Sequence, residues 1–335
     1  MYNGKKGGEK MDIELAKMLQ GTKKDKWLSL LAKAGLSADM QQESTVLIWE
    51  NDTLVATGSR WGNILKCIAV DDAYRGLDLT ATVLTQLRQD AFSAGFSHLF
   101  LYTKPQNEYL FSSLLFYPIA RTPDVLLMEN RQNGIADFLN TLPVAEGKTV
   151  GAAIMHCDPF TKGHRYLIET AAKECDRVYV FVLSEDRGSF CAKDRLELVK
   201  KGTADLANVT VLPTGPYLIS AATFPTYFLK EQNKGAQVQC QLDIEIFTKY
   251  FVPKFGIQKR FVGTEPLCPV TAKYNEALAA ALPQKGIELR QIPRLEQDGC
   301  PVSASAVRAS LQDKKKLEQL VPQTTLDYLL KKEEV

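Results

Sequence analysis

The sequence predicts an α/β fold in two parts, a mixed sheet with helices followed by a doubly wound parallel sheet. Three observations support this fold class. Turn residues Asn51 and Asp52 separate two strand-like runs, as in an antiparallel hairpin. In the second half, fully apolar runs alternate with helical patterns, which is typical of parallel strands joined by helices. A stretch at 131–148 that contains Gly and Pro separates the hairpin-rich first part from the alternating strands and helices of the second.

The first part is expected to be a leader, a helix and then a meander. Residues 1–10 are basic and Gly-rich, and we expect them to be disordered. Apolar residues between Met11 and Leu36 recur at helical spacing. The first domain, residues 11–130, then continues with strands at 44–50, 53–59 and 63–70, a helix at 79–95, a strand at 98–103, a helix at 109–116 and strand-like sequence at 117–130.

The second part follows a linker, 131–148, that carries one short helix. It spans 149–335 and alternates strand and helix. Its continuous apolar strands need helices on both faces of the sheet. The expected order is a strand at 149–155, a helix from 162, a strand at 177–184, a helix at 194–206, a strand at 208–214, a helix at 226–232, a strand at 259–265, a helix at 271–282, a strand at 287–294 and a helix at 303–313.

Composition excludes several classes of function. The formal charge is only +2 and the 41 basic residues are spread along the chain, so we expect no nucleic-acid partner and no membrane. The 7 cysteines form no CxxC pair, which argues against a disulfide framework or a zinc site, and we expect no protein metal ligands. Without a signal peptide or an apolar run of about 18 residues, a cytoplasmic location is expected.

The loop after the strand at 149–155 is the first candidate site, because ligands bind at the carboxyl ends of strands in open α/β sheets. The helix that follows has free N–H groups that suit an anion. Gly163 would let a phosphate approach the backbone, and Thr161 and His164 can donate to it. Alternatively, Thr161 only caps the helix and His164 packs. The candidate residues of this loop are Pro159, Phe160, Thr161, Gly163 and His164.

A second candidate turn lies near the end of the chain, at 302–308. Ser303 and Ser305 open a helix there, and Arg308 offers a guanidinium that matches phosphate oxygens. Such a turn can hold the distal phosphates of a nucleotide. Taken alone, it also fits an N-capped surface helix.

Two further loops lie at the same expected sheet edge. Lys193 and Arg195 follow the second strand of the parallel sheet and are candidates for contact with phosphate or an acyl substrate. A solvated helix start capped by Asp194 is the alternative. Gly263 and Glu265 end a later strand and are candidates for ligand contact at this edge, or form an ordinary turn.

Together, the two turns resemble the nucleotidyltransferase superfamily, with its (H/T)xGH motif and a late ISSTxxR-like run. The matching stretches are TKGH at 161–164 and VSASAVR at 302–308. The resemblance implies that the residues of both turns bind ATP with Mg²⁺ and that His164 and Arg308 act catalytically on its phosphates. Thr161 stands where histidine is commoner, and Ala304 replaces a serine.

The first part resembles an N-acetyltransferase of the GNAT type, by its meander followed by a helix. That family binds the pyrophosphate of acetyl-CoA on a (Q/R)xxGxG/A loop. The best alignment here starts at Arg75 and places Asp78 and Thr80 where the family has glycine or alanine. A carboxylate would repel pyrophosphate, so an active acetyltransferase is not expected.

Nearly the whole chain, from about residue 30 onward, resembles the family of [citrate (pro-3S)-lyase] ligases, whose members join a GNAT-like half to a TxGH half. The resemblance implies an AMP-forming ligase. Acetate would be activated as acetyl-adenylate and passed to the thiol of a CoA-like prosthetic group on the citrate lyase acyl carrier subunit. The matching stretches are at 101–120, 156–169, 184–230 and 302–308.

Other functions stay open. One is an adenylyltransferase of the phosphopantetheine type, which acts on a phosphorylated small molecule. Another is a nucleotide sensor without catalysis, and a GNAT acetyltransferase is a further one. The first part of the chain would receive the prosthetic-group arm or would serve only for docking or packing.

Overall fold

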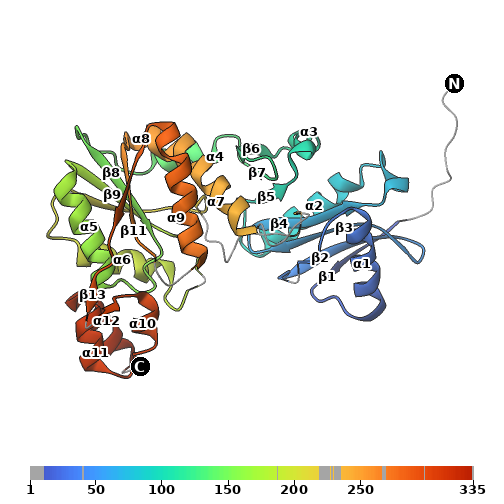
Figure 1. Cartoon of the computed structure of the whole chain (residues 1–335). Helices are drawn as coiled ribbons and strands as arrows, with labels where there is room; N and C mark the ends of the chain where they lie inside the picture. Colours follow the sequence, from blue (N-terminus) through green and yellow to red (C-terminus); the bar gives the residue numbers. More distant parts are fainter. Residues whose placement is uncertain are drawn as a thin grey trace. The chain divides into compact units, whose positions relative to one another are not determined.

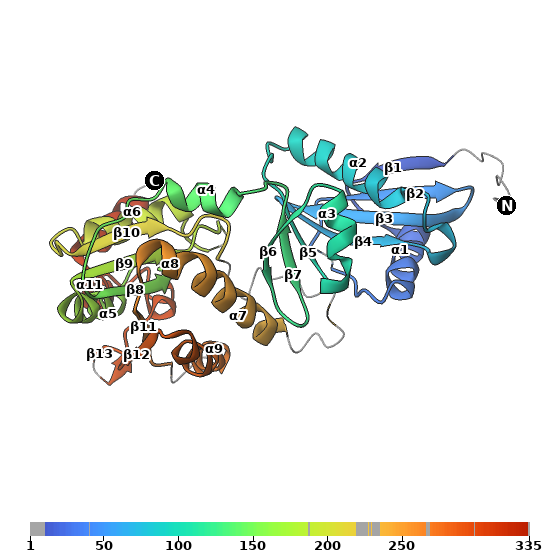
Figure 2. The same cartoon turned by 90° about the horizontal axis from the view of Figure 1, so that it is seen from above.

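Two sheets of different construction organise the computed structural model, which describes residues 11–39, 41–186, 188–218, 227, 229, 235–265, 269–297 and 299–333 (Figures 1 and 2). The described residues divide into two units. The first runs up to Gly134 and also takes in the described residues 227, 229 and 235–238; the second holds the remaining described residues. The α/β fold class expected from the sequence is confirmed.

The first unit is built on a mixed sheet of seven strands among its described residues, in the order β1-β2-β3-β4-β5-β7-β6. The meander β1 to β4 is antiparallel, as expected, whereas β4 and β5 are parallel. Its elements are β1 (Asp12–Ala16), α1 (Gly21–Lys33), β2 (Ser44–Glu50), β3 (Thr53–Trp61), β4 (Ile64–Val70), η1 (Asp72–Tyr74), α2 (Leu79–Ser93), β5 (Phe100–Thr103), η2 (Pro105–Asn107), α3 (Glu108–Ser113), β6 (Tyr117–Arg121) and β7 (Leu126–Glu129).

Strands β4 and β5 pair only at their beginnings, where Ile64 and Leu65 lie opposite Phe100 and Leu101. Beyond these pairs the described strands have no ladder between them, so the sheet opens toward their carboxyl ends. Helix α2 packs closely on the sheet, since a Cβ added at Gly58 would lie 2.5 Å from a Val83 methyl group.

The start of the first unit differs from the sequence expectation. A single helix over 11–36 was expected, but Asp12–Ala16 forms a strand that pairs antiparallel with β2, and α1 begins only at Gly21. Ile13 and Leu15 are exposed on this strand, while Trp27, Leu30 and Leu31 of α1 are buried. Pairing with β2 satisfies the backbone of the segment, so tertiary context overrides its helical spacing.

The second unit carries a parallel sheet of five strands among the described residues, in the order β10-β9-β8-β11-β12. Its elements are α4 (Gly134–Asn140), β8 (Val150–Met155), α5 (Lys162–Glu174), β9 (Arg177–Val182), α6 (Ala192–Gly202), β10 (Val209–Pro213), α7 (Gly235–Ile246), the π-helix η4 (Phe247–Phe251), α8 (Val252–Phe255), β11 (Lys259–Gly263), α9 (Pro269–Ala281), η5 (Pro283–Lys285), β12 (Glu288–Ile292), β13 (Glu296–Gln297), β14 (Cys300–Pro301), α10 (Ala304–Arg308), α11 (Lys314–Leu320) and α12 (Gln323–Glu333).

Helices cover both faces of this sheet (Figure 1). On one face, valines of β9 pack with α5 and α6 in a single core. On the other, Tyr179 and Phe181 contact the rings of Phe251 and Phe255. The chain moves from β8 outward to β10 and then returns to β11, so β8 and β11 are adjacent strands at which the order reverses. Such a switch point leaves a crevice at the carboxyl ends.

The three C-terminal helices, α10, α11 and α12, form a small core of their own around Val307, Leu317 and Leu326. Tyr328 of α12 donates a 2.6 Å hydrogen bond to Asp194 at the start of α6. This bond ties the end of the chain to the edge of the sheet where the strands end.

Several expectations for the second unit need comment. The strands at 149–155, 177–184, 208–214 and 259–265 are confirmed with slightly shorter bounds. The helix expected at 226–232 lies largely outside the described residues, and Tyr227 within it belongs to a turn. Helices α7, α8, α11 and α12 were not predicted. None of the described helices combines the length and the apolar character that a membrane span requires.

A buried ionic cluster joins α2 to the first sheet. Asp90 accepts hydrogen bonds from Arg60 at 2.6 Å, Ser44 at 2.5 Å and Lys17 at 2.7 Å. Burial opposes the charged form, but these bonds outweigh it and lower the pKa of Asp90 to about 2. The side chain of Arg60 is only 2% exposed and pairs with two carboxylates, the exposed Glu43 and the buried Asp90, so Asp90 is its buried counter-charge.

Replacing Asp90 with Asn should therefore destabilise the first unit by about 3 kcal/mol, because Arg60 loses its buried counter-charge. Lys17→Ala is the matched control, since Lys17 is 65% exposed and its loss should cost less than about 1 kcal/mol. All 3 tryptophans, Trp27, Trp49 and Trp61, lie in this unit, so tryptophan fluorescence in urea reports its unfolding. Equal effects of the two substitutions would contradict the role given to Asp90.

Candidate active site

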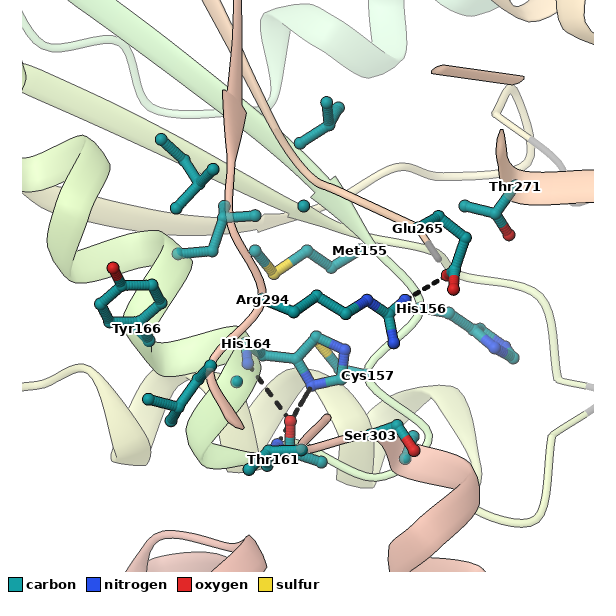
Figure 3. Close-up of a pocket in the computed structure, with 18 of the residues that line it drawn as sticks. Met155, His156, Cys157, Thr161, His164, Tyr166, Glu265, Thr271, Arg294 and Ser303 are labelled. Atoms are coloured by element: carbon teal, nitrogen blue, oxygen red, sulfur yellow. Dashed lines mark hydrogen bonds and ion pairs between the residues drawn. The ribbon is translucent and has the colours of Figure 1, made fainter. Parts of the chain in front are cut away.

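A cavity of about 680 Å³ lies at the carboxyl ends of β8 and β11, within the second unit (Figure 3). This is the switch point of the parallel sheet, and the volume falls within the range of ligand sites in proteins. The cavity brings together both candidate turns, although they are far apart in the sequence. The candidate residues that line it are Thr161, Gly163, His164, Gly263, Glu265, Ser303, Ser305 and Arg308.

The first turn is organised by a reciprocal cap between Thr161 and His164. The backbone N–H of His164 donates to the Thr161 hydroxyl at 3.2 Å, and the backbone N–H of Thr161 donates to Nδ1 of His164 at 3.1 Å. Gly163 packs against the chain of the second turn, because a Cβ there would lie 2.7 Å from the Val302 carbonyl oxygen. The cap fixes the imidazole, and the glycine lets the two turns meet.

His164 is therefore a neutral donor. Since Nδ1 accepts from Thr161, the ring proton is assigned to Nε2. Removal of the ring from water, with smaller contributions from the charges of Arg294 and His156, lowers the pKa of His164 to about 4. A neutral imidazole with its Nε2–H free of the cap can donate to an anion without carrying a charge of its own.

The second turn is attached to the first by Arg308. Its guanidinium donates to the Asp158 carbonyl oxygen, lies 3.5 Å from the Asp158 carboxylate and donates to the Ser305 hydroxyl at 3.1 Å. Asp158 in turn accepts from the backbone N–H groups of Ser189 and Phe190 at 3.0 and 2.9 Å. Ser303 accepts from the Ala306 N–H at 3.1 Å and so caps α10.

Arg294 is a site residue that the sequence expectations missed. It follows β12, and its Nε donates to the Thr264 carbonyl oxygen at 2.8 Å while Nη2 pairs with Glu265. Figure 3 shows its side chain extending between His164 and Glu265. Its position just past a strand of the parallel sheet, at the edge already predicted to bind ligands, was the signal that could have found it.

Four candidates lie away from the cavity wall. Phe160 is fully buried in the core beneath α5, and Pro159 precedes it in the loop. The Lys193 side chain is exposed on α6. Arg195 is 0% exposed and donates to the backbone carbonyls of His156 at 2.7 Å, Phe190 at 3.1 Å and Glu185. In this structure, Arg195 supports the two loops that carry His156 and Glu185.

The electrostatics of the cavity favour a polyanion. Arg294 and Arg308 contribute cationic groups, and His164 and the serines contribute neutral donors. Asp158 and Glu265 partly balance the arginines. Among the residues that the structure describes, no group of three or more His, Cys, Asp or Glu side chains is placed to hold a metal ion.

A second cavity, of about 710 Å³, lies within the first unit where β4 and β5 diverge. Arg75, Asp78 and Thr80, the positions aligned with the acetyl-CoA loop, line it at the start of α2. Asp78 has a φ of 54°, and its side chain does not cap α2. Tyr227 closes part of the wall and donates to the Tyr102 carbonyl oxygen at 2.6 Å.

Comparison with known proteins identifies the family. Residues 150–329 match the family model described as the citrate lyase ligase C-terminal domain. The [citrate [pro-3S]-lyase] ligase of Klebsiella pneumoniae is 40% identical over 304 residues, which cover 88% of this chain and 89% of that protein. The chain belongs to the citrate lyase ligase family. The family model begins at β8 and ends within α12, so it includes both turns of the cavity.

Other similarities of this family member are partial. A phosphopantetheine adenylyltransferase of Clostridium botulinum is 43% identical over 95 residues, which cover 26% of this chain and 54% of that protein. Among solved structures, Escherichia coli ElaA matches 36% of this chain and all of its own, with 14% identity and a TM-score of 0.33.

The state of His164 can be tested directly by NMR, because the chain has only 3 histidines. With ¹⁵N-labelled imidazoles, the His164 ring should stay neutral down to about pH 5, with its proton on Nε2, since its pKa is lowered to about 4. The unfolded ring titrates near 6.5, so this group lowers stability as pH falls from about 6.5 to about 4. His164→Asn assigns the resonance. A titration near pH 6.5 in the folded protein would refute the neutral donor.

Proposed function

We propose that this protein is an ATP-dependent, AMP-forming ligase that activates acetate and acetylates the thiol of the CoA-like prosthetic group on the acyl carrier subunit of citrate lyase. The observation that carries the proposal is that His164 and Arg308 line one cavity at the switch point of the sheet. Membership of the citrate lyase ligase family supports it. The enzyme would act where ATP and citrate lyase are found, in the cytoplasm.

In the first step, an acetate oxygen attacks the α-phosphorus of ATP. The new O–P bond forms as the bond to pyrophosphate breaks, and no proton needs to move. Negative charge builds on the phosphate oxygens and on the leaving pyrophosphate. We propose that this charge is stabilised by preorganised hydrogen-bond donors, namely His164 Nε2–H, Arg308 and the hydroxyls of Ser303 and Ser305.

In the second step, the thiol sulfur bonds to the carbonyl carbon of acetyl-adenylate and the carbon–oxygen bond to AMP breaks. The thiol proton passes to solvent or to the departing phosphate. No protein nucleophile is required, so positioning and electrostatics supply the catalysis. Thr161 and Gly163 hold the first turn, while Gly263 and Glu265 lie where a nucleoside would extend along the sheet edge.

We propose that Mg²⁺ accompanies the phosphates of ATP. Magnesium bound to nucleotides keeps several waters and takes few protein ligands. The donor set around the cavity, with its arginines and hydroxyls, fits phosphates better than a bare cation. When bound, the ion would neutralise part of the charge that develops on the phosphates.

Exchange of labelled pyrophosphate into ATP in the presence of acetate tests the first step. Wild-type protein should exchange with acetate and not with 4′-phosphopantetheine. The opposite result would favour an adenylyltransferase of the phosphopantetheine type, the second candidate, which the partial similarity to the Clostridium botulinum enzyme supports. Exchange with neither would contradict both activities.

The donors can be tested by a matched pair of substitutions at His164. Asn keeps an acceptor for the Thr161 N–H but removes the Nε2 donor, so His164→Asn should lower kcat on the order of 10²–10³-fold. His164→Gln places an amide donor near Nε2 and should recover part of the loss. Arg308→Ala should lose a similar factor, while Arg290→Ala, on the exposed part of β12, serves as the control. Full exchange activity in His164→Asn would remove His164 from the mechanism.

For the first unit, we propose that the cavity between β4 and β5 receives the prosthetic-group arm. The limited pairing of β4 with β5 and the cavity volume of about 710 Å³ support this role. Hydrogen exchange with pantetheine, a thiol-arm probe without the pyrophosphate that Asp78 would repel, should show protection of 68–70, 76–81 and 101–103, with β1 as an internal control. Protection confined to the second unit would leave the first unit a docking or packing role only.

A further inference from the structure

The cavity of the second unit continues onto the face of the sheet opposite α5. Side chains alternate along β11, and Phe261 packs into the core beneath α5. Arg260 therefore points to the other face, where its guanidinium lies 4.9 Å from the Phe247 ring. Arg260 and Tyr274 line the cavity on this side, together with Ile154 and Val262. Helix α9 adds Thr271 and Asn275 to this part of the wall, so its polar groups are the Arg260 guanidinium, two hydroxyls and an amide.

Arg260 is buried without a hydrogen-bond acceptor. Arg260 is only 2% exposed. Within the described chain, neither its Nε nor its Nη1 has a hydrogen-bond partner. Burial lowers the pKa of Arg260, although the charges of Tyr274 and Asp243 oppose the shift. A guanidinium remains charged in proteins, so its buried N–H groups are costly until an anion accepts from them.

Asp243 is near enough to influence Arg260 but does not satisfy it. Its Oδ2 accepts from the Tyr274 hydroxyl at 2.6 Å, and its Oδ1 has no partner among the described residues. Burial raises the pKa of Asp243 to about 6. No ion pair within 4.0 Å joins Asp243 to Arg260 in the described structure. The N–H groups of the Arg260 guanidinium therefore remain available to a ligand in the cavity.

We propose that Arg260 binds the carboxylate of the acid substrate. The proposal rests on the proposed ligase function and assigns the second substrate of the same cavity. The phosphate donors come from the turns at 161–164 and 302–308, whereas Arg260 lies on β11 beside Ile154 and Val262 of the cavity wall, with the Phe247 ring packed against its guanidinium. One buried cation with apolar neighbours suits a short carboxylate with a small alkyl group.

This contact would orient the reaction. A carboxylate has two oxygens, and a guanidinium that holds one of them leaves the other free to attack the α-phosphorus. The held oxygen becomes the carbonyl oxygen of acetyl-adenylate. During attack by the thiol, the same N–H groups would face the negative charge that develops on that oxygen.

The test compares Arg260→Met and Arg260→Lys with the exposed control Arg290→Met in the full chain. In acetate-dependent pyrophosphate exchange, Arg260→Met should raise KM for acetate on the order of 10²-fold and KM for ATP less than about threefold, since a charge-assisted hydrogen bond contributes about 1.5–3 kcal/mol. Arg260→Lys should fall between. An unchanged KM for acetate, or an equal rise in both constants, would overturn the proposal.

Two further measurements separate this proposal from failure of the ligase function and from a structural role. Broadening of the ¹³C-acetate NMR signal by wild-type protein, absent with acetamide and with Arg260→Met, would support the carboxylate site even if no exchange occurred. Persistent broadening with Arg260→Met would contradict it. Removing an unpaired buried charge should leave the Tm unchanged or raise it, whereas a lower Tm would indicate that Arg260 is structural.

Discussion

The candidate site is organised around one long-range contact, the attachment of Arg308 to Asp158, whose positions are 150 residues apart in the sequence. Asp158 belongs to the loop after β8, and Arg308 ends α10. Because Asp158 also accepts two backbone N–H groups near the start of α6, three segments meet at one carboxylate. The close approach of Gly163 to the Val302 carbonyl reinforces the same junction. The cavity exists because these segments converge.

The donors around the cavity differ in how their charge is held. Arg294 and Arg308 are cations balanced by carboxylates, His164 is neutral, and Arg260 is a cation without a hydrogen-bonded partner among described residues. A cation that is already paired with a carboxylate can also bind an incoming phosphate, at a modest cost in free energy. An unsatisfied buried cation instead favours any anion small enough to reach it. The cavity thus distinguishes a large polyanion from a small monoanion by position and by burial.

Sequence reasoning reached the parts of this site that depend on local rules. The strand-to-helix turn at Thr161–His164 and the capped turn at Ser303–Arg308 could be found from their residue types and from the carboxyl-edge rule. Arg294 obeyed the same rule and was overlooked. Arg260 could not be found this way, because a charged residue inside an apolar strand gains its meaning from Asp243 and Tyr274, which the fold alone brings near.

The fold shows the same division. Meander strands and the apolar parallel strands have periodic sequences, so their existence was predictable. The segment at 12–16 has helical spacing but pairs with β2, and α7 has no clear apolar stripe because successive residues, such as Val238, Gln239 and Cys240, are all buried. Tertiary contacts decide such segments, and no local pattern encodes them. Phe247, Phe251 and Phe255 do recur at helical spacing, and that signal was overlooked.

The division of the chain has a consequence for how the protein can be separated into halves. Tyr227 is encoded within the second half of the gene, yet its hydroxyl and its carbonyl are bound by Tyr102 and Ser37 of the first unit. Cutting the gene near residue 149 would remove Tyr227 from the cavity wall of the first unit and leave the tyrosine in the carboxyl-terminal fragment without these partners. A fragment designed to contain the first unit alone should therefore also include Tyr227, which belongs to that unit.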